Sequence, residues 1–347
     1  MVRKLPMPSD NSSDLSVLIG RFQPFHLGHL GLLDKALELA PRALLVVGSA
    51  HGPRLVKNPF TAEERIEGIR QSLPAELRPR VSFATVRDYY DEPRWAAAVE
   101  TAVTREAGGG RVTLVGFRKD DTSSYLSLFP QWQEHAAPRQ APIDGTALRR
   151  LYFAGGAELA PELLAAVPPA IAQFLARFQA TAEFERLGEE LVALDKSRAT
   201  YGDGPFVTVD AVVTMGERLL LIQRGRAPGK GLWALPGGFL DGSERLLSAA
   251  IRELKEETVV ACDDAELRRC FRAVAVFDHP QRSQRGRTIT HAHYFALDGA
   301  ALPSVEGADD AQAARWVKIA DLPSMASELF EDHFQIIDHF LKLPEPR

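Results

Sequence analysis

The chain has 347 residues, which is long for one domain and comfortable for two. Its hydrophobic and charged contents are ordinary for a globular protein, and its formal net charge of −5, without a long basic run, argues against nucleic acid as the main partner. Cys262 and Cys270 form no metal-binding spacing, the polar start carries no signal peptide, and no apolar run reaches membrane-spanning length. We therefore expect a cytoplasmic protein with reduced thiols and no membrane or nucleic-acid partner.

The first half of the chain alternates predicted strands with predicted helices. Strands are expected at 16–19, 43–47, 81–86 and 112–115, and helices from about 27, at 61–73 and around 95–107. Thr61 and Glu64 have capping-box spacing, and the Gly run 108–110 is a helix stop. The alternation predicts a doubly wound parallel sheet with right-handed crossovers, whose ligands bind beyond the carboxyl ends of the strands.

The first strand-to-helix loop, GRFQPFHLGH at 20–29, contains two histidines. If the helix begins near Leu27, His26 and His29 lie at its positive end, one turn apart, and Gly28 lets backbone approach a ligand closely. Such a site suits the charge that builds on phosphate oxygens during nucleotidyl transfer. The alternative is that one histidine caps the helix and the other lies on the surface.

This loop resembles that of the H-x-G-H nucleotidyltransferases, and further motifs resemble the archaeal-type nicotinamide mononucleotide (NMN) adenylyltransferases. These are NPFT at 58–61 followed by Glu64 and Arg65, RW at 94–95, and IDGTALR at 143–149. The resemblance implies AMP transfer from ATP to NMN, giving NAD and pyrophosphate. It implies catalytic roles for His26, His29 and Arg149, and nucleotide or substrate contacts from Gly20, Arg21, Phe22, Gly28, Trp95, Lys119 and Thr146.

Several of these residues have plainer alternatives. Trp95 would serve equally well as a core aromatic residue, and Arg21 as an exposed loop arginine. Asp144 stands where the family usually has Ser, so it either takes part in metal binding or caps the following helix. Lys119 is placed by the segment 119–130, which resembles the stretch after the family's fourth strand.

The middle of the chain predicts a domain boundary. A helical stretch at 159–178 is broken at Pro168-Pro169, a charged helix follows at 183–199, and 201–205 is rich in turn residues. We expect a nucleotidyltransferase domain at 14–180, a helical linker at 181–204 and a second domain at 205–347. Within the second domain we expect a hairpin of strands at 206–214 and 219–223, strands at 270–277, 288–297 and 315–318, and a last helix burying Phe330, Phe334, Ile337 and Leu341.

A loop-helix segment at 237–260, GGFLDGSERLLSAAIRELKEETVV, carries the strongest motif. Ser243 is expected to cap the helix, and Leu247, Ile251, Leu254 and Thr258 form its buried stripe. Glu253, Glu256 and Glu257 are spaced to share another face, where like charges repel in the absence of a cation. Oxygen ligands of this kind suit Mg²⁺ or Mn²⁺.

The segment resembles the Nudix box, which implies a mixed sheet between helices, an α/β/α fold. The resemblance implies catalytic roles for Arg252, Glu253 and Glu257, and a metal held by Glu253, Glu256, Glu257 and the Gly237 carbonyl. Val259 replaces the Gly that usually ends this helix. Arg282 and Arg285 either contact a phosphate or lie in a solvated loop. The catalytic base is left open between His291, His293 and the pair Asp309-Asp310.

Both halves together resemble the bacterial bifunctional NMN adenylyltransferase/Nudix hydrolases. The resemblance implies the substrates ATP, NMN and ADP-ribose, with ADP-ribose cleaved to AMP and ribose 5-phosphate, and Mg²⁺ as cofactor, Mn²⁺ being an alternative. Two competing hypotheses are a different acceptor phosphate, such as nicotinate mononucleotide or a phosphopantetheine, and a Nudix half that senses ligands without turnover. The sequence leaves a homo-oligomer open.

Overall fold

The computed structural model describes residues 13–116, 127–137, 143–156, 158–299 and 301–344. The chain divides after Gly188 into two compact units, an N-terminal and a C-terminal one. Within the described ranges, no helix combines the length and the apolar character needed to cross a bilayer.

The N-terminal unit is built on a five-stranded sheet with the order β3-β2-β1-β4-β5. All neighbouring strands run parallel. Because β1 lies between β2 and β4, consecutive connections leave it in opposite directions, and the loop after β1 lies where a doubly wound sheet binds its ligands. The expected parallel doubly wound sheet is confirmed. Its strands are β1 (Leu15–Gly20), β2 (Arg42–Val47), β3 (Val81–Thr85), β4 (Val112–Gly116) and β5 (Gln133–Ala136).

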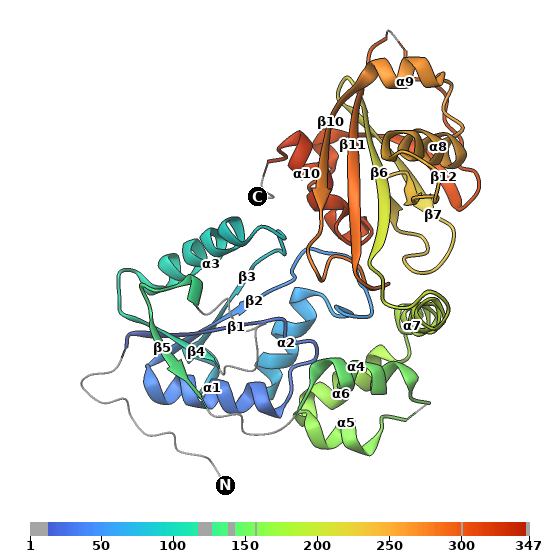
Figure 1. The fold of residues 1–347 in the computed structure, drawn as a ribbon. Helices are drawn as coiled ribbons and strands as arrows, with labels where there is room; N and C mark the ends of the chain where they lie inside the picture. Colours follow the sequence, from blue (N-terminus) through green and yellow to red (C-terminus); the bar gives the residue numbers. More distant parts are fainter. Residues whose placement is uncertain (1–12, 117–126, 138–142, 157, 300, 345–347) are drawn as a thin grey trace. The chain divides into compact units, whose positions relative to one another are not determined.

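Helices lie on both sides of this sheet, with α1 and α3 on opposite faces (Figure 1). Val99 and Val103 of α3 pack on one face, against Leu44 and Val46 of β2 among others. The start of α2 follows its sequence: Glu64 N donates to Thr61 Oγ1 at 3.3 Å and Thr61 N donates to Glu64 Oε2 at 2.8 Å, which is the expected capping box. The helices of this unit are α1 (Leu27–Leu39), α2 (Ala62–Ser72), η1 (Arg78–Arg80), α3 (Glu92–Ala107), α4 (Gly145–Ala154), α5 (Pro161–Ala166) and α6 (Pro169–Phe178).

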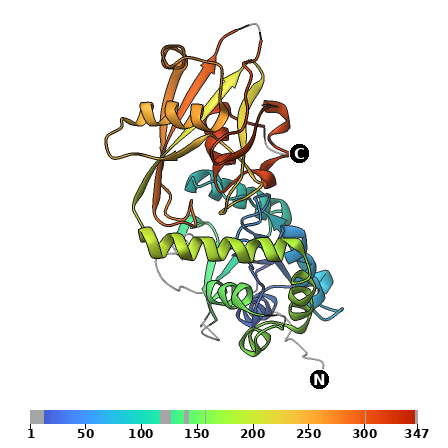
Figure 2. The same cartoon turned by 90° about the vertical axis from the view of Figure 1, so that its right-hand side faces the viewer.

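A single long helix, α7 (Ala182–Tyr201), passes from one unit into the other. Figure 2 shows it as one uninterrupted helix. The expected boundaries at 180/181 and 204/205 stay predictions.

The C-terminal unit contains a seven-stranded mixed sheet. Its main path is β10-β11-β6-β7-β12, with β9 paired to β6 and β8 paired to β7. Only β11 and β6 run parallel along this path, and the other pairs are antiparallel. The strands are β6 (Phe206–Met215), β7 (Arg218–Arg224), β8 (Trp233–Ala234), β9 (Gly237–Phe239), β10 (Phe271–Phe277), β11 (Thr288–Leu297) and β12 (Ala311–Lys318).

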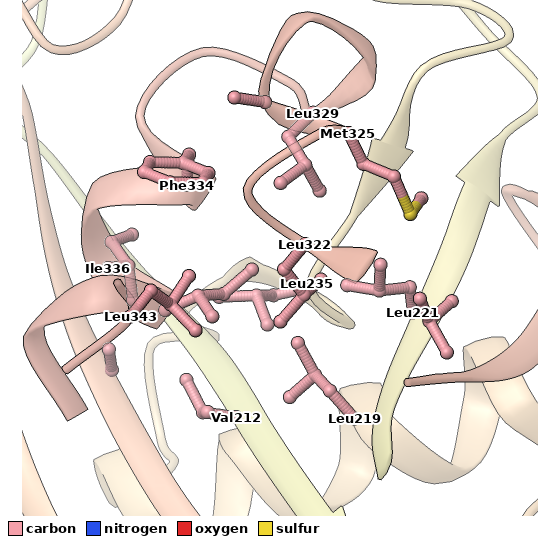
Figure 3. Packing of buried hydrophobic residues seen from close by; sticks show 14 residues of the cluster. Val212, Leu219, Leu221, Leu235, Leu322, Met325, Leu329, Phe334, Ile336 and Leu343 are labelled. Atoms are coloured by element: carbon pink, nitrogen blue, oxygen red, sulfur yellow. The ribbon is translucent and has the colours of Figure 1, made fainter. Parts of the chain in front are cut away.

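Helices cover both faces of this sheet, which confirms the expected three-layer α/β/α arrangement. On one face Ile251 and Leu254 of α8 pack against Phe295. On the other, Phe334 and Ile336 of α10 face Leu219 and its neighbours across an apolar cluster (Figure 3). The helices are α8 (Leu246–Thr258), α9 (Asp264–Cys270), η3 (Ile319–Asp321), η4 (Ala326–Glu328) and α10 (His333–Leu341).

Two local predictions in this unit are wrong. Ser243 does not cap α8, because the helix begins later, at Leu246, with Arg245 as its N-cap residue and no side-chain cap. The preceding Glu244 instead pairs with Arg252. Phe330 is buried as expected but precedes α10, which begins at His333. The short elements β5, β8, β9 and α9 were not expected, since each has too few residues for a periodic pattern.

Val259 ends α8 in a left-handed conformation, with φ 46° and ψ 32°. This conformation is costly for a β-branched residue, and the exposed side chain recovers little by packing. We expect Val259→Gly to raise the free energy of unfolding of the C-terminal unit by about 0.5–1 kcal/mol, the released strain exceeding the extra chain entropy of Gly. Urea unfolding measures the change. Val192→Gly, at an exposed helical position of α7, is the control and should destabilise by about 1 kcal/mol; equal destabilisation by both would contradict the prediction.

Candidate functional site

The two histidines of the first loop form a reciprocal cap on α1. His29 N donates to His26 Nδ1, and His26 N donates to His29 Nδ1, each at 3.3 Å. The two rings stack with their centroids 3.6 Å apart. The structure thus brings His26 and His29 together at the positive end of the helix, and the cap uses the side chains of both.

This cap fixes the protonation of the two rings. Because each Nδ1 accepts a backbone N–H, each neutral ring carries its proton on Nε2. Burial, and secondarily the charge of His26, lower the pKa of His29 well below its usual value, so His29 is neutral at pH 7. The Nε2–H group of a neutral imidazole is a hydrogen-bond donor that suits a phosphate oxygen.

Two buried arginines hold the loop that precedes the histidines. Arg149 donates to Gln23 O at 2.7 Å and to Thr146 Oγ1 at 3.0 Å. Arg65 donates to Arg21 O at 2.6 Å and, through its remaining N–H groups, to the carbonyls of Gly48, Ser49 and Thr61. Burial, with the positive charge of Arg21 adding to it, lowers the pKa of Arg149 to about 10, so the guanidinium remains charged at pH 7.

Arg65 and Gln23 received no role from sequence reasoning. Gln23 connects the loop to the segment before α2 by donating to Phe60 O at 2.9 Å and accepting from Phe60 N at 3.0 Å. The only sequence signal for a role of Arg65 was its position shortly after the NPFT motif. Both residues shape the loop through backbone groups far away in sequence.

The other predicted residues of this unit take different positions. A side chain at Gly20 or Gly28 would approach the ring of Phe22 or His26 to 3.1 Å, so close packing favours glycine at both places. Asp144 Oδ1 caps α4 by accepting from Thr146 N at 2.7 Å. Trp95 on α3 is half-buried, 6.0 Å from the Phe129 ring centroid, and Arg21 is exposed. Lys119 lies outside the described residues.

In the C-terminal unit, two glycines at the start of β9 let this strand approach its neighbours closely. A Cβ at Gly237 would lie 2.2 Å from Val209 O, and a Cβ at Gly238 would lie 2.5 Å from Glu253 Oε1. No other residue fits either place without moving backbone or a partly buried carboxylate. Strand β9 therefore packs closely against β6 on one side and α8 on the other.

Arg252 links the carboxylates of α8 and the preceding loop. Its guanidinium donates to both oxygens of Glu244, at 2.7 and 3.0 Å, to Glu253 Oε1 at 2.9 Å and to Glu256 Oε2 at 2.8 Å. Hydrogen bonding to Glu244 is the largest cause that raises the pKa of Arg252, so this guanidinium is permanently charged. As a result, Glu253 and Glu256 are oriented by one side chain.

Glu257 is the most deeply buried of these carboxylates. It is 5% exposed and accepts a hydrogen bond from Gly237 N at 2.9 Å. Burial, together with the negative charge of Glu253, raises its pKa to about 8. A carboxyl group held this way favours a positive ion beside it.

These oxygen donors fit a hard divalent cation, with Glu253, Glu256 and Glu257 as the residues that would hold it. Across the described residues, however, no three acidic, imidazole or thiol groups stand close enough together to form a ready metal cage, because Arg252 binds two of the carboxylates. The oxygen ligands are thus of the right chemical type for the ion. In this structure, however, two of the carboxylates are paired with Arg252.

Two buried polar residues lie next to the segment 235–237, and sequence reasoning did not identify either of them. His333 Nδ1 accepts from Leu235 N at 2.8 Å, and burial lowers the pKa of His333 to about 3, so the ring stays neutral and keeps this bond. Asp210, opposite Gly237 in the sheet, accepts from Thr290 Oγ1 at 2.6 Å. Both come from segments without a motif, so no local pattern could have indicated them.

The arginines of the predicted phosphate-binding loop take different positions. Arg282 is 3% exposed and forms a two-point ion pair with Asp332, at 2.7 and 2.8 Å. Its guanidinium is committed to this pair, so its position corrects the expectation of a phosphate contact or a solvated loop. Arg285 lies 5.3 Å from the Phe239 ring, beside the box. Arg224, to which no role was given, lies 4.2 Å from the Phe330 ring and is close enough to Arg285 and Glu257 for their charges to affect its pKa.

The candidates for a catalytic base come from two places: His291 and His293 lie within β11, and Asp309 and Asp310 directly precede β12. Burial raises the pKa of Glu253, and the negative charges of Glu256 and then Asp309 add to this effect. Asp310 pairs with Arg226 at 2.6 Å. His293 Nδ1 lies 2.9 Å from the His291 carbonyl oxygen. Asp309 is thus a candidate whose charge acts on the carboxylate cluster.

Comparison with known proteins identifies a family for each unit. The NUDIX domain family matches residues 204–340, and the cytidylyltransferase-like family matches residues 17–94. A nicotinamide/nicotinic acid mononucleotide adenylyltransferase from Acinetobacter baylyi is 34% identical over 186 residues, 53% of this chain and 96% of that protein. An ADP-ribose pyrophosphatase from Methanocaldococcus jannaschii is 33% identical over 138 residues, 40% of this chain and 74% of that protein.

One solved structure matches both units together. The bifunctional NMN adenylyltransferase/ADP ribose pyrophosphatase from Francisella tularensis superposes with a TM-score of 0.89 at 32% identity, covering 95% of this chain and 99% of that one. The same protein complexed with AMP and Mn ion gives a TM-score of 0.88. On the strength of this full-length match, the chain belongs to the family of bifunctional NMN adenylyltransferase/ADP-ribose pyrophosphatases.

Proposed function

We propose that the N-terminal unit transfers AMP from ATP to NMN, giving NAD and pyrophosphate, and that the C-terminal unit hydrolyses ADP-ribose to AMP and ribose 5-phosphate. The full-length similarity to the Francisella enzyme, with both motif sets present, carries this proposal. In it, His26, His29 and Arg149 serve the first reaction and Arg252, Glu253 and Glu257 the second.

Adenylyl transfer needs two phosphates held in line. The NMN phosphate oxygen attacks the α-phosphorus of ATP, a new P–O bond forms, and pyrophosphate leaves with the electrons of the broken bond. The Nε2–H donors of His26 and His29 face the negative charge that grows on phosphate oxygens, and Arg149 adds a fixed positive charge. These groups are held in place before the substrate arrives, so little reorganisation is needed.

The C-terminal unit differs from the first because its site is rich in carboxylates, which bind a cation and not a phosphate directly. A divalent ion, which we propose to be Mg²⁺ with Mn²⁺ as a substitute, supplies charge neutralisation of the diphosphate and a lower pKa for water. Glu253, Glu256 and Glu257 are the residues that would hold it. Arg252 keeps two of these carboxylates oriented, and Arg285 and Arg224 place positive charge beside the box for the substrate phosphates.

A second acceptor is favoured by one relative. The Acinetobacter protein is named for both nicotinamide and nicotinic acid mononucleotide. We therefore include nicotinate mononucleotide as a second acceptor for the first unit.

A product assay tests the proposal directly. Purified protein is incubated with ATP, Mg²⁺ and either NMN or nicotinate mononucleotide, and separately with ADP-ribose and Mg²⁺. We expect dinucleotide and pyrophosphate in the first reactions, and AMP with ribose 5-phosphate in the second. Tight binding of ADP-ribose without product would instead favour the ligand-sensing alternative.

His29→Ala tests the first site. The substitution removes one Nε2–H donor and one half of the reciprocal cap, so we expect NAD synthesis to fall by about a hundredfold or more. The readout is initial rate at saturating ATP and NMN. ADP-ribose hydrolysis by the same preparation is the control and should stay near the wild-type rate; unchanged NAD synthesis would remove His29 from the reaction.

Glu257→Gln tests the second site. The amide keeps the size of the side chain but cannot ionise to become a carboxylate ligand for a divalent ion, so we expect ADP-ribose hydrolysis to fall to roughly 1% of wild type or less. Glu328→Gln, an exposed position in the same unit, is the matched control. NAD synthesis should persist in both variants, and equal loss of both activities in Glu257→Gln would argue against two separate sites.

A further inference from the structure

Two residues connect β8 to β9, and only one of them has a backbone donor. Leu235 and Pro236 lie between Ala234, the last residue of β8, and Gly237, the first residue of β9. Pro236 has no N–H group, so Leu235 N is the single donor of this connection. Pro236 O accepts a hydrogen bond from Ala211 N of β6 at 2.8 Å. The N–H group of Leu235 therefore needs an acceptor of its own.

His333, the first residue of α10, supplies this acceptor. Its Nδ1 accepts a hydrogen bond from Leu235 N at 2.8 Å, and both residues are buried. Leu235 lies in an apolar cluster together with Leu329 and Ile336 (Figure 3). A buried N–H group in apolar surroundings is costly to leave without an acceptor, so this bond fixes the backbone at Leu235.

The other edge of the His333 ring faces Asp210. Because Nδ1 accepts, the neutral ring carries its proton on Nε2, which lies 3.9 Å from Asp210 Oδ1. Asp210 is also the sheet partner of Gly237, and its Oδ1 would lie 2.8 Å from a Cβ at Gly237. Asp210 Oδ2 is held by the hydroxyl group of Thr290 at 2.6 Å. His333 and Gly237 thus lie against the same fixed carboxyl group.

The short connection links the position of Leu235 to the carboxylates of α8. A proline has a fixed φ angle and restricts the residue before it, so Leu235 and Pro236 form a stiff pair. Gly237 follows directly, and its N–H donates to Glu257 Oε2 at 2.9 Å. A shift of the backbone at Leu235 would therefore displace the N–H group that orients Glu257.

We propose that His333 is a positioning residue of the C-terminal site. Through Leu235 and Gly237 it holds Glu257 in the orientation in which this carboxylate binds the divalent ion, and it contacts neither the ion nor the substrate itself. The inference rests on the proposed function of the C-terminal unit, since it takes Glu257 as a ligand of the ion. It assigns a role in the reaction to a residue that lies outside the Nudix box.

Binding of Mn²⁺ to the full-length protein tests the proposal without turnover. His333→Leu removes the acceptor at similar side-chain volume, whereas His333→Asn offers an amide oxygen near the position of Nδ1. Electron paramagnetic resonance measures the dissociation constant, and Glu257→Gln identifies the ion bound at this site. We expect the constant to rise roughly ten- to a hundredfold in His333→Leu and to stay near the wild-type value in His333→Asn. Equal weakening in both variants, or wild-type affinity in His333→Leu, would overturn the proposal.

A matched control separates positioning from a general loss of stability. Ile337→Val removes one methylene group from a fully buried residue of the same helix and lowers stability without removing a hydrogen bond. Thermal unfolding of each variant measures this loss. Mn²⁺ affinity should stay at the wild-type value in Ile337→Val. If it weakens as much as in His333→Leu, destabilisation alone explains the effect and the proposal fails.

Kinetics distinguish this inference from the proposed function. In His333→Leu, the Mg²⁺ concentration for half-maximal hydrolysis of ADP-ribose should rise, while KM for ADP-ribose at saturating Mg²⁺ should change little. A raised KM with an unchanged Mg²⁺ requirement would instead indicate a substrate contact and contradict the proposal. A wild type that binds Mn²⁺ without hydrolysing ADP-ribose would overturn the proposed function, and the comparison of Mn²⁺ affinities would still decide the role of His333.

Discussion

Guanidinium groups that each donate two or more hydrogen bonds hold both sites in shape. In the N-terminal unit, Arg65 and Arg149 donate to carbonyls of the loop that leads to the histidines. In the C-terminal unit, Arg252 donates to the carboxylates of three glutamates. A planar group with several fixed donors defines positions more strictly than a flexible ammonium does, so each site is ordered before any substrate binds.

The acceptors of these guanidinium groups determine the charge of each site. Carbonyls carry no formal charge, so the positive charges of Arg65 and Arg149 remain and, with the exposed Arg21, surround the loop where phosphates are expected. Carboxylates outnumber Arg252, and the burial that raises the pKa of Glu257 to about 8 is offset when a positive ion lies beside that carboxyl, so the box favours a cation. The same residue type therefore prepares one site for phosphate oxygens directly and the other for a cation between protein and phosphate.

Local patterns predicted what depends on neighbours in sequence. The capping box of Thr61 and Glu64, the start of α1 at Leu27 and the strand Thr288–Leu297 follow from spacing over a few residues, and the structure has them. Helix α8 was also predicted correctly, apart from its N-cap residue. Ser243 failed as a cap because Glu244 is drawn to Arg252, a partner eight residues further along that competes with the local signal.

Residues that support the sites from a distance were not predictable in this way. His333 meets Leu235 across 98 positions, and Arg149 meets Gln23 across 126. Arg282 lies in a stretch rich in arginine that reads as solvated, and only the folded sheet shows that Asp332 lies opposite it. Burying such a pair is costly unless both partners are present and well aligned, so removing either one leaves an unpaired charge. Long-range polar pairs of this kind therefore fix the positions of the loops, although no local sequence pattern predicts them.

The interactions described for each site also explain how one chain supports two chemistries. Arg65, Gln23 and Arg149 bind groups of the N-terminal unit, and Arg252, Asp210 and His333 bind groups of the C-terminal unit. The hydrogen-bond partners named here lie within the same unit as the residue that binds them. A substitution in one network thus removes partners only within that unit, and the other site keeps its loop geometry and its charge. Separate polar networks are the physical reason to expect that a substitution in one unit leaves the activity of the other intact.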